Sequence, residues 1–247
     1  MYFDTDCLEL LNNKWNVCKK QIIVSAPTFY FTNDSNRILT PLHKANKRGT
    51  SGSKWKQAYQ AVKHNRKNSL KLATIENLLH AMGALYILNL YYRDEMIPIG
   101  RVYMSNNVFD SRGGSDIFSV FTYRATVLSM SLNMGDNSII SQNENDLDKA
   151  IYIIKYDNAS FEQMYDGFCK DNEITLNNFY NSPEIISYLQ AHPDYKVESI
   201  NKTCLDVGGI DLLRKVMSFT HSGSNDTKVE AILNKHRNIY PIYSSEN

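Results

Sequence analysis

The sequence turns from basic to apolar within residues 53–92, which read SKWKQAYQAVKHNRKNSLKLATIENLLHAMGALYILNLYY. In the first part, apolar side chains recur three to four positions apart, a spacing typical of an amphipathic helix. The second part is a longer apolar run that also favours a helix. We therefore expect helices over residues 54–67 and 69–93, separated near Asn68, where Ser69 would cap the second helix. One continuous helix is the alternative, since no proline interrupts the segment.

A helical wheel of the first helix assigns positions to its side chains. One apolar stripe contains four of them: Trp55, Ala58, Tyr59 and Val62. Arg66 falls in the same stripe, so we expect its guanidinium to leave the stripe at the helix end or to be held inside by an acid or carbonyl groups. We also expect Arg66→Ala to lower thermal stability. His64 falls on nearly the opposite side, so it can share a ligand with Arg66 only if the helix ends or bends near residue 64.

The basic residues around these helices form a block without acids. Between Ser35 and Ile75 the chain has no Asp or Glu. The same window holds ten of the 27 basic residues: Arg37, Lys44, Lys47, Arg48, Lys54, Lys56, Lys63, Arg66, Lys67 and Lys71. Such a cluster attracts polyanions, and the interleaved Trp55 and Tyr59 offer rings on which bases can stack. The alternative is a solvated basic face that acids from the C-terminal half neutralise.

The composition of the whole chain sets limits on these interpretations. Of the 247 residues, 43% are apolar and 21% are charged, as in ordinary globular proteins, and the net charge is only +1. The four cysteines form no C-x-x-C pair, and neither a P-loop nor a G-x-S-x-G motif is present. We therefore expect a reduced, cytoplasmic protein without a metal or cofactor. The acidic N-terminus predicts no export signal, and the longest apolar stretch, residues 81–90, is too short for a membrane span.

The remaining segments predict the fold. Alternating apolar and polar residues with glycines favour a β region over residues 99–135. Polar or proline starts favour four further helices, at 160–170, 183–191, 208–220 and 226–237. We predict a mainly α protein, a helical bundle with a small β-rich middle segment, α+β overall. It would be one domain, residues 1–247, divided into a helical core at about 37–95, a β-containing insertion at about 99–135 and a helical C-terminal part at about 150–240.

The motif W-x3-Y-x3-K-H-x-R, with the Ala- and Leu-rich helix after it, resembles HEPN-like (higher eukaryotes and prokaryotes nucleotide-binding) bacterial proteins. Here it consists of Trp55, Tyr59, Lys63, His64 and Arg66. The resemblance implies a helical bundle, often dimeric, in toxin–antitoxin, abortive-infection or CRISPR-linked defence, and many members are metal-independent ribonucleases.

The family's usual site is an Arg followed four to six residues later by a polar His, an order that this motif reverses. Two other pairs fit that spacing: Arg37 with His43, and Arg214 with His221. We therefore keep open a family branch in which the motif is structural or only binds RNA or nucleotide.

Metal-independent RNA cleavage would assign simple roles to this motif. It needs an acid and a base near neutral pKa, which suits His64, and cations for the phosphorane, which suits Lys63 and Arg66. We predict six substrate-binding residues beside them: Arg48, Lys54, Trp55, Lys56, Tyr59 and Lys67. The expected partners are RNA or nucleotide and a second copy of the chain. The alternatives are a non-catalytic adaptor that docks an acidic protein of a defence operon, a DNA-binding protein, and, for His64, a polar helix-end residue bonded to a carbonyl.

Overall fold

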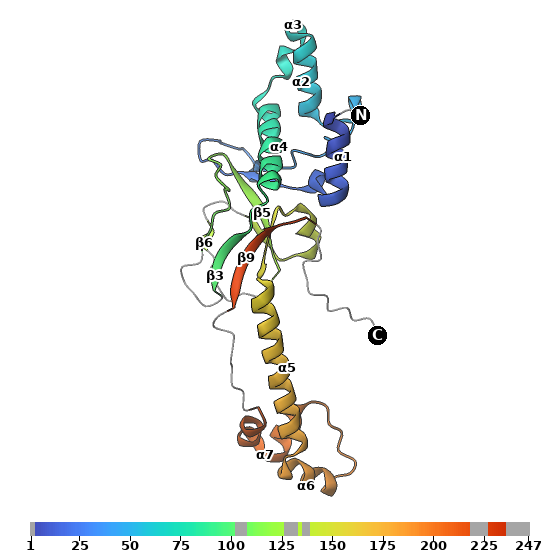
Figure 1. The fold of residues 1–247 in the computed structure, drawn as a ribbon, viewed down its shortest axis with the longest axis vertical. Helices are drawn as coiled ribbons and strands as arrows, with labels where there is room; N and C mark the ends of the chain where they lie inside the picture. The colour runs from blue at the N-terminus through green and yellow to red at the C-terminus, as the bar shows by residue number, and fades with distance from the viewer. Residues whose placement is uncertain (1–2, 102–107, 126–132, 135–138, 218–226, 236–247) are drawn as a thin grey trace. The chain divides into compact units, whose positions relative to one another are not determined.

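The structure is a computed structural model that describes residues 3–101, 108–125, 133–134, 139–217 and 227–235. The chain divides into two compact units (Figure 1). The sheet unit comprises Met1–Tyr156 and Lys228–Asn247, and the helical unit comprises Asp157–Thr227. From the sequence we expected one domain, with a helical C-terminal part at about 150–240. Within the described residues, no helix combines the length and the apolar character needed to cross a membrane.

A mixed sheet of seven strands forms the centre of the sheet unit. Six strands follow one another in the order β2 (Ile38–Leu39), β1 (Ile22–Val24), β5 (Phe118–Arg124), β8 (Tyr152–Tyr156), β9 (Lys228–Leu233) and β3 (Ile97–Arg101). The seventh, β7 (Ile139–Ser141), pairs with β5. β5 runs parallel to β7 and β8, and the other pairs in this sheet are antiparallel. A separate parallel pair joins β4 (Val108–Phe109) to β6 (Asn133–Met134).

The sheet overturns the predicted mainly helical bundle. The first six residues of β5 are buried, as are the first three of β8, because both strands lie inside the sheet. The prediction of a helix at 226–237 is also wrong, since the described part of this segment contains β9. Val229, Ala231 and Leu233 are buried and alternate with two half-buried side chains, which is the period of a strand.

The helices of the sheet unit include three of more than one turn: α1 (Phe3–Trp15), α2 (Lys54–His64) and α4 (Ile75–Arg93). α4 begins after Thr74, whose hydroxyl accepts a hydrogen bond from the Asn77 N–H at 3.2 Å. Its buried side packs on the sheet at very short range. A Cβ at Gly83 would lie 2.6 Å from Ile22 Cδ1 and 2.9 Å from Pro41 Cγ, so a larger residue would force these side chains to shift.

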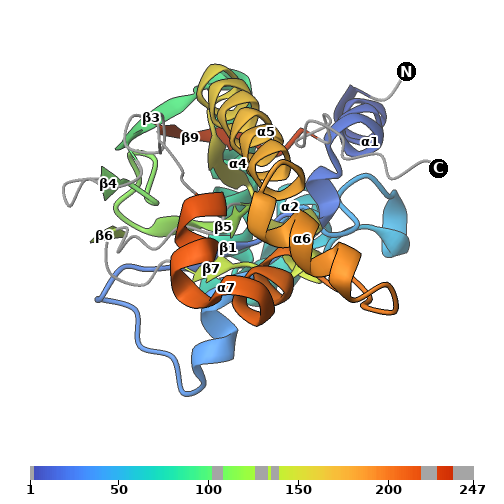
Figure 2. The same cartoon turned by 90° about the horizontal axis from the view of Figure 1, so that it is seen from below.

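The helical unit contains α5 (Asn158–Tyr180), α6 (Pro183–Ala191) and α7 (Ile200–Val216). Figure 2 shows α6 and α7 beside α5. Five buried side chains form its core: Phe179, Ile185, Cys204, Leu212 and Val216. The helix predicted at 183–191 is confirmed, and the one predicted at 160–170 lies within α5. The helix predicted at 208–220 overlaps the second half of α7, which starts earlier, at Ile200, and is kinked at Gly209, where φ is 64° and ψ is −156°.

Candidate nucleic-acid interface

The basic arm, as we name residues 54–72, consists of α2, the single turn α3 (Arg66–Ser69) and the 3-10 turn η4 (Leu70–Leu72). α2 ends at His64, because Asn65 adopts φ −144° and ψ 67°, while its N–H still donates to Ala61 O at 2.8 Å. The break therefore lies at Asn65 and not at the predicted Asn68–Ser69. The second long helix starts at Ile75 and not at Ser69.

The position of this break changes the environment of Arg66. The helical wheel extended α2 to residue 66 and assigned Arg66 to the apolar stripe. Because the helix has already ended, Arg66 is exposed and does not belong to the stripe. His64 is exposed as well, on the other side of Asn65. The condition for the two side chains to share a ligand, a helix that ends near residue 64, is therefore met.

Several basic side chains of the arm have no partner among the described residues. Exposed and without a side-chain hydrogen bond or ion pair to another described residue are Lys54, Lys63, His64, Arg66, Lys67 and Lys71. Lys63 instead lies over the Tyr59 ring, with Nζ 5.9 Å from the centroid. Basic side chains of this kind can exchange their counterions for the phosphates of a polyanion.

The two aromatic residues of the arm have different environments. Tyr59 is 60% exposed. Trp55 is half-buried against the core of the sheet unit, and its Nε1–H donates to Pro41 O at 2.8 Å. The two rings line an apolar groove of about 330 Å³ between α2 and the start of α4, together with Leu72, Ile75 and other side chains. Tyr59 is therefore free to stack on a base, whereas the fold already uses the indole of Trp55.

Two of the predicted substrate-binding cations already have partners within the chain. Arg48 Nη2 lies 2.6 Å from Asp6 Oδ1, and Lys56 Nζ donates to Ala45 O at 2.9 Å. Neighbouring Lys47 is 3.9 Å from Glu9 Oε2. Both acids belong to α1, so the N-terminal helix neutralises part of the basic block.

A polar hollow beside the arm gathers titratable side chains that the sequence analysis did not combine. Its volume is about 780 Å³, and the titratable side chains that line it are His43, Lys44, Lys54, Glu76 and His80. Burial lowers the pKa of His80, and the Glu76 carboxylate opposes that shift. The i,i+4 spacing of Glu76 and His80 was the available signal; nothing in the sequence placed His43 with them.

The two alternative Arg–His pairs do not add a second site. Arg37 donates through Nη1 to Val24 O at 3.3 Å and pairs with Asp34 at 3.3 Å, so its guanidinium is held away from a ligand role with His43. His221 lies outside the described residues, so the pair with Arg214 has no structural outcome. Within the described part of the chain, no cluster of three or more His, Cys, Asp or Glu side chains is arranged to hold a metal ion.

Comparison of the chain with protein-family models, curated proteins and solved structures found no match. The resemblance of the arm to the HEPN motif is therefore untested by relatives. The arm provides exposed basic side chains without partners among the described residues, and one exposed tyrosine whose ring lies under Lys63.

Proposed function

We propose that the chain binds single-stranded RNA through the basic arm. The observation that carries the proposal is the group of exposed basic side chains of the arm that have no partner among the described residues, together with exposed Tyr59. These basic residues are Lys63, His64, Arg66, Lys67 and Lys71, and Lys63 lies over the Tyr59 ring. Guanidinium and ammonium groups bind phosphates, and an exposed ring stacks on an unpaired base. A duplex would hide its bases from Tyr59, so single strands fit this surface better. The proposal places the protein in the cytoplasm with its RNA.

The resemblance extends this proposal to metal-independent RNA cleavage in defence against phage. In that reaction His64 would transfer the proton, and Lys63 and Arg66 would bind the phosphate. Among the described residues, no side chain bonds to His64 to fix its tautomer. Binding therefore has more support from the geometry than cleavage does.

The test measures fluorescence anisotropy of a labelled single-stranded RNA in EDTA, over a series of salt concentrations. The arm variant is Lys63→Ala/Arg66→Ala/Lys67→Ala, and the matched control is Lys14→Ala/Lys170→Ala/Lys196→Ala. All six side chains are exposed, and none has an ion pair with a described residue. We expect the arm variant to lose roughly 10²-fold in affinity at low salt and about 2 units of the log–log salt slope, because three phosphate contacts are removed.

Three outcomes would contradict RNA binding by the arm: equal losses in both variants, tighter binding of duplex DNA than of single-stranded RNA, or no binding of nucleic acid at all. The last outcome would favour the protein-docking alternative. The same RNA, incubated and resolved on a gel, tests cleavage. Products that disappear with His64→Ala support the enzyme, and intact RNA restricts the proposal to binding.

A further inference from the structure

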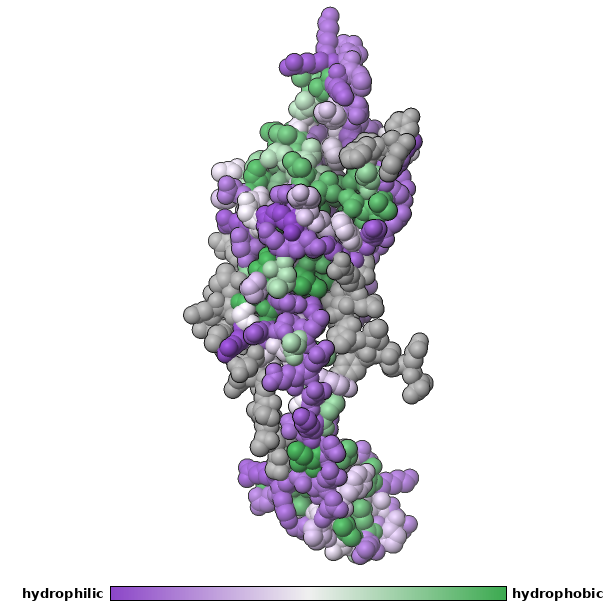
Figure 3. Space-filling view, viewed as in Figure 1, coloured by the Kyte–Doolittle hydropathy of each residue, from purple (hydrophilic) through white to green (hydrophobic). Residues whose placement is uncertain are grey.

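The outward face of α4 carries a regular row of side chains that the fold does not use. They are spaced alternately three and four residues apart: Ile75, Leu78, Met82, Leu85, Asn89 and Tyr92. Ile75 and Leu85 are each 69% exposed, and Tyr92 is 88% exposed. Figure 3 shows hydrophobic side chains gathered over α4 on this face. We name these six residues the α4 seam.

The opposite side of α4 already contributes to the core of the sheet unit. Leu79, Ile87 and Leu90 are at most 7% exposed and pack in the main core cluster. The helix is thus apolar on both sides, which is typical of a helix that is covered on both sides. Within the described chain, the seam side is the uncovered one.

The spacing of the seam fits another helix of the same kind. Apolar residues at alternating intervals of three and four form the a and d positions of a heptad, whose side chains insert between those of a facing helix. In this register Ile75, Met82 and Asn89 occupy a positions, and Leu78, Leu85 and Tyr92 occupy d positions. A surface with this self-complementary pattern indicates a second copy of the chain as its partner.

Asn89 determines the direction of the pairing. In a parallel pair, equivalent a positions meet, so the Asn89 amides of the two copies face each other and can exchange hydrogen bonds. In an antiparallel pair, a positions meet d positions, and the same register places Asn89 against Leu78 of the partner. A desolvated amide without a hydrogen-bond partner costs about 1–3 kcal/mol. The single polar residue of the seam therefore favours the parallel arrangement.

No charged side chain lies along the middle of the seam to oppose an identical helix. The residues that flank the seam are Ala81, Tyr86 and Leu88, with Arg93 only at the end of α4. The Arg93 guanidinium pairs with Glu95 of its own chain. No like charges therefore meet along the middle of the helix pair, and the uncharged seam offers nothing specific to an acidic or basic partner.

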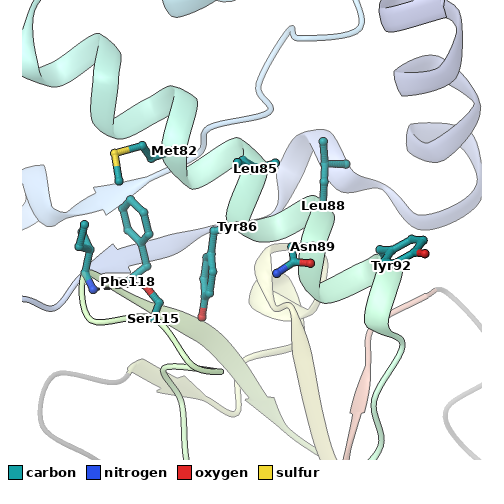
Figure 4. A pocket seen from close by; sticks show the side chains of 9 residues that line it. Met82, Leu85, Tyr86, Leu88, Asn89, Tyr92, Ser115 and Phe118 are labelled. Atoms are coloured by element: carbon teal, nitrogen blue, oxygen red, sulfur yellow. Dashed lines mark hydrogen bonds between the residues drawn. The ribbon is translucent and has the colours of Figure 1, made fainter.

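The apolar area extends beyond the helix itself. Leu72, 38% exposed, continues it past the N-terminal end of α4. On the flank of α4, Met82, Leu85, Asn89 and Tyr92 line a hollow of about 660 Å³ with Tyr86 and Phe118 as its inner wall (Figure 4). Monomeric proteins rarely expose contiguous apolar patches above a few hundred Å², and a stable dimer needs about 800 Å² on each copy. The five apolar side chains of the seam, 37–88% exposed, form a patch of the kind that monomers rarely expose.

We propose that two copies of the chain pair in parallel through the α4 seam, with Asn89 facing Asn89 of the second copy. The arm adjoins the N-terminal end of α4, so the pair would bring two basic arms to the same end. The dimer itself does not depend on RNA binding.

Sedimentation equilibrium of the full chain over a range of concentrations tests the association. We expect wild type to be a dimer and Leu85→Glu to be monomeric, because the variant brings two carboxylates together in the seam. The matched control is Leu10→Glu, on a leucine of α1 that is 52% exposed and outside the seam. It should leave the dimer intact. Both replaced side chains face solvent, so circular dichroism should show both variants folded.

Disulfide crosslinking tests the direction, with exposed Cys169 first replaced by serine. Asn89→Cys alone should form a crosslinked dimer under mild oxidation. An antiparallel pair would instead crosslink only when Asn89→Cys and Leu78→Cys are mixed. That result, a monomeric wild type, or a dimer that survives Leu85→Glu would each overturn the proposal.

Discussion

The acid-free block has two halves, the loop before α2 and the basic arm, which look alike in sequence and differ in the structure. In the loop before α2, Lys47 and Arg48 face Glu9 and Asp6 of α1 at 3.9 Å and 2.6 Å. In the arm, the side chains from Lys63 to Lys71 face no carboxylate of the described chain. The same run of basic residues thus contains cations that pair with acids of the fold and cations that are available to a ligand.

The difference shows why a local charge count does not locate a binding surface. Arg48 and its acid are 42 residues apart, so the pairing exists only because α1 packs beside the loop. The arm has no such neighbour, since α2 ends at His64 and α3 leaves the helix axis. The acids that neutralise the loop come from the N-terminus and not, as the alternative interpretation supposed, from the C-terminal half. Ion pairs at this exposure are weak and screened by salt, but they still lower the local potential.

The largest predicted effect separates the two aromatic residues of the arm. Tyr59→Ala should lower RNA affinity by roughly 5- to 100-fold, the worth of one stacked base, because the ring is exposed and carries Lys63 beside it. The melting temperature of Tyr59→Ala should hardly differ from that of wild type. Trp55→Ala should instead act on stability and lower the free energy of unfolding by about 2 kcal/mol or more. It removes half-buried packing and the hydrogen bond to Pro41.

Anisotropy titrations and thermal melts of both variants provide the measurements, with Tyr59→Phe as the control that keeps the ring. If Tyr59→Phe loses as much affinity as Tyr59→Ala, the hydroxyl and not the stacking surface binds RNA. Full affinity in Tyr59→Ala would exclude the Tyr59 ring from the binding site.

Local patterns predicted the helices of this chain better than its core. Ser182 precedes helix α6 and Pro183 begins it, so both signals are adjacent in sequence to the helix that they predict. The sheet depends on short strands that pair across long separations, such as Ile22–Val24 of β1 with the first half of β5. Three apolar residues in a row are too few to favour a strand. Segment 226–237 was misassigned because its Ala, Glu, Leu and Lys favour a helix, although Val229, Ala231 and Leu233 alternate as in a strand.

The residues of the candidate site could be predicted from the sequence. Which of them are exposed, and which already bond within the chain, could not. Lys63, His64 and Arg66 were recognisable from spacing, and their exposure follows from a bend at Asn65 that the wheel did not include. Nothing in the local sequence indicated that Trp55 bonds to Pro41 or that Lys56 bonds to Ala45, because these bonds require the loop to fold back on α2.

A smaller effect should appear when the pairs of the loop are changed. Lys47→Ala/Arg48→Ala should lower RNA affinity by less than about 3-fold, because these charges are already compensated. Asp6→Asn/Glu9→Gln should raise it by about 2- to 3-fold, since it removes two negative charges that lower the local potential at these cations. Glutamine at position 9 keeps an oxygen for the Asn46 amide, which donates to Glu9 in wild type.

The same anisotropy assay at low salt measures both double variants, and both changes should vanish at high salt. Lys47→Ala/Arg48→Ala combined with Asp6→Asn/Glu9→Gln is the control, and its affinity should match that of Lys47→Ala/Arg48→Ala. If Lys47→Ala/Arg48→Ala loses as much RNA affinity as the arm variant, the loop and the arm do not differ in RNA binding.

The smallest effect concerns the stability of Arg66→Ala. The wheel predicted a lower melting temperature, because it assigned the guanidinium to the apolar stripe. The structure exposes Arg66 beyond the end of α2, where its replacement breaks no described ion pair or side-chain hydrogen bond. We therefore expect the free energy of unfolding to change by less than about 0.5 kcal/mol, or ~1–2 °C, in a calorimetric melt. Val62→Ala, which shortens a half-buried side chain of the stripe, should cost more than Arg66→Ala. If Arg66→Ala is the more damaging of the two, α2 continues through Asn65 in solution, and Arg66 belongs to the fold instead of the RNA surface.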